Sequence, residues 1–264
     1  MKRFALFLFT LAVFLGFAGL SRATFFGDAQ TGLRSVVSGK YRYSLYVPKD
    51  YSPDRSWPLV IALHDEGGLG EDYIQDWLEG ANERGFLVFS PTYPVPRDLP
   101  HPTDQWLLER KHEIEQEYAV DPNRILVTGT GFGGHYALYL GLQYPNEFSA
   151  VVSVGNALGG RLERFFNLHH SKGDRLPILI LNGPEPAVSD TERTTMGLDF
   201  IRSRGYSVET VDAQKADELK LSNVGSYIYE WFDQLSKKRT ENKGKPVSGL
   251  KQSFWGEGKN PVRG

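Results

Sequence analysis

Hydrophobic and polar residues alternate along two short segments near the start of the chain, residues 35–37 and 41–47. Ser38-Gly39-Lys40 separates these segments and Pro48 ends the second, so the pattern predicts a β-hairpin. Continuous apolar runs follow, and they are typical of strands that are buried on both faces. These runs lie at residues 59–63, 86–89, 125–128, 150–154 and 178–181. Residues 206–211 alternate again, as an edge strand does.

Helical segments are expected between these runs. One helix follows the turn at residues 64–68 and ends near Arg84. Thr103 or Asp104 is the expected cap of a second helix that ends at Tyr118, and Asp121-Pro122-Asn123 predicts a turn into the next strand. Further helices are expected at residues 132–144, at residues 189–204 and from residue 222 or 223 onward.

A hairpin followed by strands that alternate with helices predicts an α/β fold with a mostly parallel central sheet and helices on both faces. Sheets of this kind bind ligands at the carboxyl ends of their strands. The expected strand ends are His64, Gly129, Gly155, Asn182 and Asp212.

The two ends of the chain differ from the middle. Lys2 and Arg3 precede an apolar run at residues 4–20, and Ser21-Arg22-Ala23 has the pattern of a signal-peptide cleavage site. Residues 1–23 are therefore expected to be a signal peptide, with an uncleaved membrane anchor as the alternative. Residues 24–235 are expected to form one domain. Residues 236–264 carry eight Lys and Arg against two Glu, a net +6, and are expected to be a disordered basic tail.

Composition and charge narrow the class of function. The chain has no cysteine, which excludes disulfides, thiolate metal sites and a cysteine nucleophile. The formal net charge is −2, and loss of three cations with the signal peptide makes it −5 (−2 minus 3), so nucleic acid is not an expected partner. No second apolar stretch is long enough to span a bilayer. The sequence thus predicts a protein that is secreted or periplasmic.

The candidate chemistry centres on residues 125–135, where an apolar strand runs through a glycine-rich turn into a helix. Strand, tight turn and helix form the nucleophile elbow, Gly-x-Ser-x-Gly, in which the serine stands exposed at the helix N-terminus. The same frame here reads Gly129-Thr130-Gly131-Phe132-Gly133, so glycine stands at the tip. Thr130 has a hydroxyl beside the tip, but the residue before the tip normally points back into the protein.

From Tyr41 to Phe232 the sequence resembles the α/β-hydrolases, and among them secreted esterases related to phospholipase/carboxylesterase and polyhydroxyalkanoate-depolymerase-like proteins. The matching segments are Tyr46-Val47-Pro48, Trp57-Pro58-Leu59-Val60, residues 118–124, Gly133-Gly134-His135, Tyr144-Pro145 and Phe148-Ser149-Ala150. The resemblance implies a serine nucleophile at position 131, an oxyanion-hole loop after residue 63, an acid after Leu181 and a histidine after the last strand.

The chain departs from the resembled family at each of these places. Gly131 stands at the nucleophile position, and Pro186 stands at the acid position with Glu185 one residue early. The oxyanion loop keeps His64 but continues with Asp65 and Glu66, whose carboxylates oppose the stabilisation of an oxyanion. No histidine follows His170, although the catalytic histidine should come after the acid.

These departures favour a catalytically degenerate hydrolase that binds a small ligand or an envelope protein. The candidate pocket residues are His64, Asp65, Glu66, Thr130, Gly131, Phe132 and Glu185. No cofactor and no metal motif is expected. Two alternatives stay open: a carboxyl-ester hydrolase with an unorthodox site, in which the acidic residues hold a metal ion, and an interaction protein whose basic tail contacts anionic surfaces or a partner.

Overall fold

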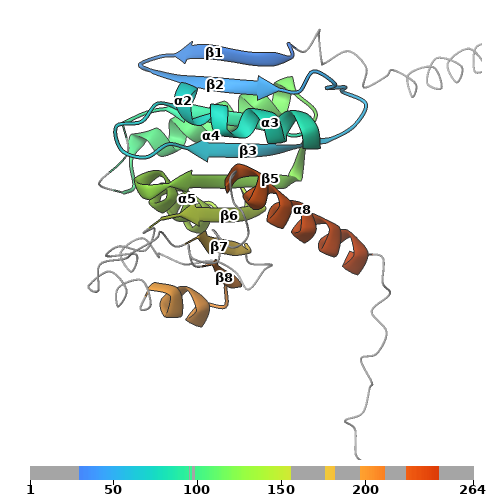
Figure 1. Ribbon diagram of the computed structural model, residues 1–264. Coiled ribbons are helices and arrows are strands. Elements are labelled where there is room, and N and C mark those ends of the chain that lie inside the picture. Colours follow the sequence, from blue (N-terminus) through green and yellow to red (C-terminus); the bar gives the residue numbers. More distant parts are fainter. Residues whose placement is uncertain are drawn as a thin grey trace, which may run out of the picture.

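The computed structural model describes residues 30–94, 96, 99–155, 176–181, 197–211 and 224–243. At their centre lies an eight-stranded sheet with the strand order β1-β2-β4-β3-β5-β6-β7-β8 (Figure 1). The strands are β1 (Gly32–Ser38), β2 (Tyr41–Val47), β3 (Trp57–Leu63), β4 (Leu87–Thr92), β5 (Val120–Thr130), β6 (Ala150–Val154), β7 (Ile178–Leu181) and β8 (Val208–Val211). β2 pairs antiparallel with β1 and with β4, and the remaining pairs are parallel. The predicted α/β class is therefore confirmed.

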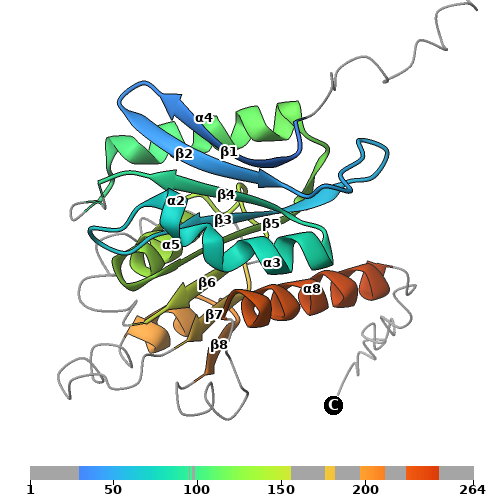
Figure 2. The ribbon, with the colours of Figure 1, turned by 45° about the horizontal axis from the view of Figure 1, so that its top comes forward.

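Helices cover both faces of the sheet (Figure 2). One face carries α4 (Pro102–Glu117), α5 (Gly131–Gln143) and the helical residues 197–203, and the other carries α3 (Gln75–Arg84) and α8 (Val224–Lys243). The short α2 (Gly70–Tyr73) precedes α3. Within β3, Ile61 packs with the α4 and α5 side and Val60 with the α3 and α8 side. Burial on both sides explains why this strand is a continuous apolar run rather than an alternating one.

The predicted turn at residues 121–123 lies inside β5 instead of before it. The pairing of β3 with β5 jumps from Trp57 opposite Val120 to Leu59 opposite Ile125, so the extra residues of β5 form a bulge. The Asp121 carboxylate accepts a hydrogen bond from the Asn123 amide at 2.9 Å. The turn chemistry is thus present, but the strand resumes its pairing on both sides of it.

The predicted cap of α4 is wrong by two or three residues. His101 is the N-cap, and its ring accepts a hydrogen bond from the Thr103 amide while the Asp104 carboxylate accepts one from the His101 amide. Asp104 is therefore the third helical residue of a reciprocal capping box, with Pro102 at the first position. The prediction failed because Ser, Thr, Asp and Asn are the usual N-cap residues, and histidine is not among them.

The expected boundary at residue 236 also needs correction, because α8 continues to Lys243. Lys237 forms an ion pair with Asp233 at 2.7 Å, four residues earlier on the same helix. Residues 236–243 contain neither glycine nor proline, and pairs of this spacing support a helix, so the charged segment continues it. Gly244 is the first residue of low helix propensity.

Several predicted features lie outside the described residues. They are the signal peptide at residues 1–23, the acid position with Glu185 and Pro186, residues 212–222 where the family would hold its histidine, and the tail from residue 244. In the part of the chain that is described, no helix is long and apolar enough to cross a membrane.

Candidate functional site

The nucleophile elbow is present in the backbone. β5 ends at Thr130, α5 begins at Gly131, and Gly131 has a φ of +53°, in the left-handed region. A Cβ atom at Gly129 would overlap the carbonyl of Gly133, and one at Gly133 would overlap the carbonyls of Leu63 and His64. The chain therefore needs both flanking glycines to bring β3, β5 and the first turn of α5 this close together. The sharp turn has been kept while its serine has not.

Asp65 occupies the space in which the nucleophile's side chain would stand. An added Cβ at Gly131 would overlap both carboxylate oxygens and the carboxyl carbon of Asp65. Asp65 is the second residue after β3, and β3 and β5 are neighbours in the sheet, so the two loops meet at the carboxyl edge. The place of the missing side chain at position 131 is filled by a carboxylate from the neighbouring loop.

The same carboxylate takes up two backbone donors. Asp65 Oδ1 accepts hydrogen bonds from the amides of Glu66 at 2.7 Å and Phe132 at 2.8 Å. In this type of fold the oxyanion hole is built from the amide of the residue after the nucleophile and an amide of the loop after β3, which are the places of these two groups. The donors therefore survive, and their acceptor is a negative charge of the protein itself at the N-terminus of α5.

This arrangement sharpens the sequence-based expectation for Asp65. We expected its carboxylate to stand beside the oxyanion position and to oppose charge there. In the structure the Asp65 carboxylate instead accepts hydrogen bonds from the Glu66 and Phe132 amides. A substrate carbonyl would therefore find these two donors already occupied. Glu66 and Phe132 are exposed on either side of it, and Phe132 has 50% of its surface accessible.

His64 lies beneath the loop, with only 2% of its surface accessible. Its Nε2 accepts a hydrogen bond from the Tyr93 amide at 3.4 Å, so the proton sits on Nδ1, which donates to the Asp65 carbonyl at 2.7 Å. Burial lowers the pKa of His64 against an opposing effect of the Asp65 carbonyl. A neutral histidine with both ring nitrogens engaged supports the loop that carries Asp65.

A cavity of about 340 Å³ lies beside the elbow, at the same edge of the sheet. It is lined by Tyr73, Asp76, Trp77, Thr130, Val154, Val224 and Gly225. Thr130, one of the predicted pocket residues, lines this cavity, whereas Tyr73, Asp76 and Trp77 were not among the predicted residues. Their i, i+3, i+4 spacing after the β3 loop was the available signal.

Thr130 shares this cavity with one carboxylate, Asp76, and with the Tyr73 hydroxyl, and no histidine lines it among the described residues. Burial raises the pKa of the neighbouring Tyr73 hydroxyl, while a hydrogen bond with Thr130 acts in the opposite direction. A phenol with a raised pKa stays protonated and does not accept a proton from a threonine hydroxyl. Within the described residues, no three His, Asp or Glu side chains gather as a metal-binding group either.

The sequence comparisons lead to acetylxylan esterases, although no family model matches the chain. The chain is 25% identical over 199 residues to a bifunctional acetylxylan esterase/xylanase of Neocallimastix patriciarum, covering 71% of this chain and 27% of that protein. It is 27% identical over 151 residues to an acetylxylan esterase of Coprinopsis cinerea, covering 49% and 39% respectively. Acetylxylan esterase A of Emericella nidulans is 22% identical over 263 residues, covering 90% and 80%. The chain thus spans less than half the length of the first two relatives.

Solved structures with a similar fold are also esterases. A thermostable esterase has a TM-score of 0.55 at 21% identity and matches 80% of this chain and 62% of its own. Esterase 2 of Thermogutta terrifontis, in its form phosphorylated by paraoxon, has a TM-score of 0.53 at 15% identity and matches 81% and 95%. Strand order, elbow and these likenesses define the class: the protein has the α/β-hydrolase fold. The fold and the esterase names of these relatives and neighbours confirm the resemblance seen in the sequence.

Proposed function

We propose that this protein is a non-catalytic α/β-hydrolase of the esterase type, which binds a ligand where its relatives carry out hydrolysis. The observation that carries the proposal is the Asp65 carboxylate, which fills the space of a side chain at Gly131 and accepts the Phe132 amide. A site of this kind lacks the nucleophile and presents an acceptor where a substrate oxygen must bind.

The energetics of the exchange support this reading. A substrate carbonyl would have to displace a carboxylate that accepts two backbone hydrogen bonds, which in this solvent-accessible loop together contribute about 1 kcal/mol. A neutral carbonyl offers weaker acceptance than a carboxylate. Ground-state substrate binding at the hole is therefore opposed, and no serine stands ready to react.

The ligand we propose is a neutral, hydroxyl-rich oligosaccharide such as an acetylated xylan fragment. The relatives named acetylxylan esterases suggest this class. The lining of the cavity beside the elbow combines two residues with hydrogen-bonding side chains, Asp76 and Tyr73, with the aromatic Trp77, a combination suited to sugars. The proposed ligand occupies this cavity, not the oxyanion hole that Asp65 holds.

The first experiment is a paired assay of hydrolysis and binding on the purified protein. Release of acetate from acetylated xylan and of nitrophenol from nitrophenyl acetate should stay at the buffer rate, and a fluorophosphonate probe should not label the protein. Calorimetric titration with acetylated xylo-oligosaccharides should give binding that Asp76→Asn weakens about tenfold. The matched control is Asp72→Asn, because Asp72 lies on the preceding helix but is exposed and outside the cavity. Turnover well above buffer would overturn the non-catalytic assignment, and absence of binding would overturn the ligand class.

The second candidate function is ester hydrolysis through an unorthodox site, and the acetylxylan esterase names of the relatives favour it. Its catalytic groups would include Glu185 or a metal ion, so turnover would fall in Glu185→Ala or with a chelator. Thr130→Val tests a third mechanism, in which Thr130 is the nucleophile, because turnover would then depend on the Thr130 hydroxyl.

Export and partner binding complete the proposal. Cleavage after Ala23 would give a mature chain that begins at Thr24, which mass spectrometry of the protein from its native source can test. The basic residues after position 236 are the proposed contact with anionic surfaces or an envelope partner, and deletion of residues 244–264, which removes four of these eight residues, should weaken such contact without unfolding the domain.

A further inference from the structure

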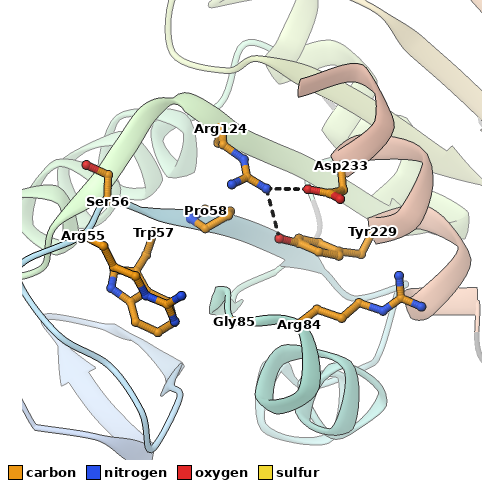
Figure 3. Close-up of a pocket in the computed structure, with 9 residues that line it drawn as sticks. All are labelled: Arg55, Ser56, Trp57, Pro58, Arg84, Gly85, Arg124, Tyr229 and Asp233. Atoms are coloured by element: carbon orange, nitrogen blue, oxygen red, sulfur yellow. Dashed lines mark hydrogen bonds and ion pairs between the residues drawn. The ribbon is translucent and has the colours of Figure 1, made fainter. Parts of the chain in front are cut away.

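A second cavity, of about 230 Å³, lies at the opposite edge of the sheet from the elbow. Figure 3 shows it between the amino ends of β3 and β5, the end of α3 and one side of α8. Arg55, Arg84 and Arg124 line it together with a single carboxylate, Asp233. These charged side chains sum to +2, in a chain whose formal net charge is −2. The concentration of positive charge is therefore local, and it runs against the charge of the whole molecule.

The three guanidinium groups come from distant parts of the chain and differ in what they contact. Arg124 uses only Nη2, which donates to Asp233 at 2.8 Å and to the Tyr229 hydroxyl at 3.4 Å. Arg55 lies over the Trp57 ring at 3.6 Å and pairs with the exposed Asp50 at 3.2 Å. Arg84 pairs with no carboxylate among the residues that the structure describes. Among the described residues, the Arg84 guanidinium and the Nε atom of Arg124 are thus donors without a protein acceptor.

The walls between the arginines are rigid. Trp57 has 1% and Tyr229 has 3% of its surface accessible. Gly85 has a φ of +73°, and a Cβ atom on it would face Trp57 and Arg55. A Cβ at position 85 would approach the Arg55 guanidinium at 3.3 Å. The absence of that atom leaves Arg55 room to lie along the cavity wall. Arg55, which lies over the buried Trp57 ring, therefore loses little side-chain entropy when an anion binds.

We propose that this cavity is a binding site for a phosphoryl group. A phosphate monoester carries between one and two negative charges at neutral pH and three strong acceptor oxygens, which match a lining of +2 and planar guanidinium donors. The volume of 230 Å³ admits such a group with a small organic part attached. Because the cavity faces away from the elbow, this proposal is independent of the proposed non-catalytic function.

Titration calorimetry of the full-length protein tests the site with glycerol 3-phosphate and inorganic phosphate, and vesicle co-sedimentation tests it with phosphatidylglycerol against phosphatidylcholine. Saturable binding of either phosphate probe supports the proposal, and so does retention by phosphatidylglycerol vesicles that falls in Arg84→Gln but not in Arg202→Gln, because the basic tail can itself contact anionic lipid. The first result identifies a soluble phosphate and the second a lipid headgroup. Sodium chloride at equal ionic strength is the reference for non-specific charge effects.

The diagnostic variant is Arg84→Gln, because within the described ranges this exposed side chain forms no ion pair whose loss would disturb the fold. We expect its Kd for the phosphate probe to rise about tenfold, as for the loss of one charge-assisted hydrogen bond. Arg202→Gln is the matched control, since Arg202 also stands near the end of a helix but away from the cavity, and it should leave the Kd unchanged.

A second variant separates binding from structure. Asp233→Asn breaks the pair with Arg124 and should lower thermal stability, yet it removes the one negative charge of the lining and should tighten phosphate binding. A purely structural cluster would lose stability without any gain in affinity. The proposal is overturned if neither phosphate nor vesicles bind beyond the chloride reference, or if Arg84→Gln and Arg202→Gln bind alike.

Discussion

The carboxylate of Asp65 and the α-carbon of Gly131 share one small volume at the elbow: the first fills the space that a side chain on the second would need. The residues at positions 65 and 131, where the chain departs from the resembled esterases, are therefore coupled in structure. A serine at position 131 requires the exposed Asp65 carboxylate to move away and to give up its hydrogen bonds from the Glu66 and Phe132 amides. The Asp65 carboxylate also accepts hydrogen bonds from two amides that, in an active esterase, are available to the substrate.

Gly131→Ser should destabilise the protein by about 1–3 kcal/mol, because position 131 has a φ of +53° and the new side chain displaces the Asp65 carboxylate from its two amide donors. Urea denaturation of the single variant, of Asp65→Gly and of the double variant measures the coupling. We expect the double variant to be more stable than the sum of the two single losses predicts. Gly39→Ser is the control for backbone strain alone, since Gly39 has a φ of +62° with no atom near its Cβ position. Additive losses would contradict the shared volume.

Restoring the serine should not restore hydrolysis. The chain has no histidine after His170, so a serine at position 131 has no base in the order that this fold uses. The double variant Asp65→Gly with Gly131→Ser should therefore hydrolyse nitrophenyl acetate no faster than the unchanged protein. A fast burst of nitrophenol from the double variant would mean that another group activates the serine.

Asp65→Ala should open the oxyanion hole to external anions. The amides of Glu66 and Phe132 lose their acceptor, and because solvent reaches this loop, the loss of stability should be about 1 kcal/mol. Acetate should then raise the melting temperature of Asp65→Ala but not that of the unchanged protein or of Asp72→Ala, by binding only to the folded state. Equal responses of all three proteins to acetate would contradict the assignment of these amides.

The fold could be predicted from the sequence because its signals are local. The apolar runs gave β6 and β7 to the residue, and the hairpin residues gave β1 and β2 within a few residues. The bulge in β5 and the extension of α8 were missed for a common reason. In both elements a contact that the local sequence does not show keeps the residues in regular structure. Residues 121–123 remain in β5 because the strand pairs with β3 on both sides of them, and the start of the predicted tail remains helical with the ion pair between Lys237 and Asp233.

Only part of the candidate site could be predicted from the sequence. Gly131 could be identified as the vacated tip because the elbow frame is contiguous in sequence. That Asp65 fills the space could not be read, since it depends on a side-chain direction set by two backbone donors from different loops. The arginine cavity was missed entirely, because Arg55, Arg84 and Arg124 meet only when the sheet and α8 are assembled.

His64 should make stability depend on pH. Burial lowers its pKa below the ordinary value of 6.5, so the unfolded chain binds a proton at pH values where the folded protein does not. Stability should therefore fall as the pH decreases through 6.5 toward the folded-state pKa, and it should level off below both. Unfolding free energies of the unchanged protein and His64→Gln between pH 8 and 5 measure this contribution. An equal slope in both proteins would show that other groups cause the acid sensitivity.

Asp104 joins the start of α4 to α5 through a buried carboxylate. It has 1% of its surface accessible, and it accepts the hydroxyl of Tyr136 at 2.6 Å and that of Tyr139 at 2.8 Å. Burial and then the Asp104 charge raise the pKa of Tyr136, so the phenol remains a donor throughout the accessible pH range. Each hydroxyl satisfies an acceptor that has no access to bulk water.

Tyr136→Phe should accordingly lower the free energy of unfolding by about 1.5–3 kcal/mol, the contribution of a hydrogen bond to a charged group. Tyr46→Phe is the matched control, because the Tyr46 hydroxyl donates to the neutral Asn82 side chain at 3.3 Å in a partly exposed place, and its loss should cost less than about 1 kcal/mol. Urea midpoints at constant m-value measure both. If the two variants lose equal stability, the Asp104 carboxylate is not held by these hydroxyls in solution, and the link between α4 and α5 rests on apolar packing alone.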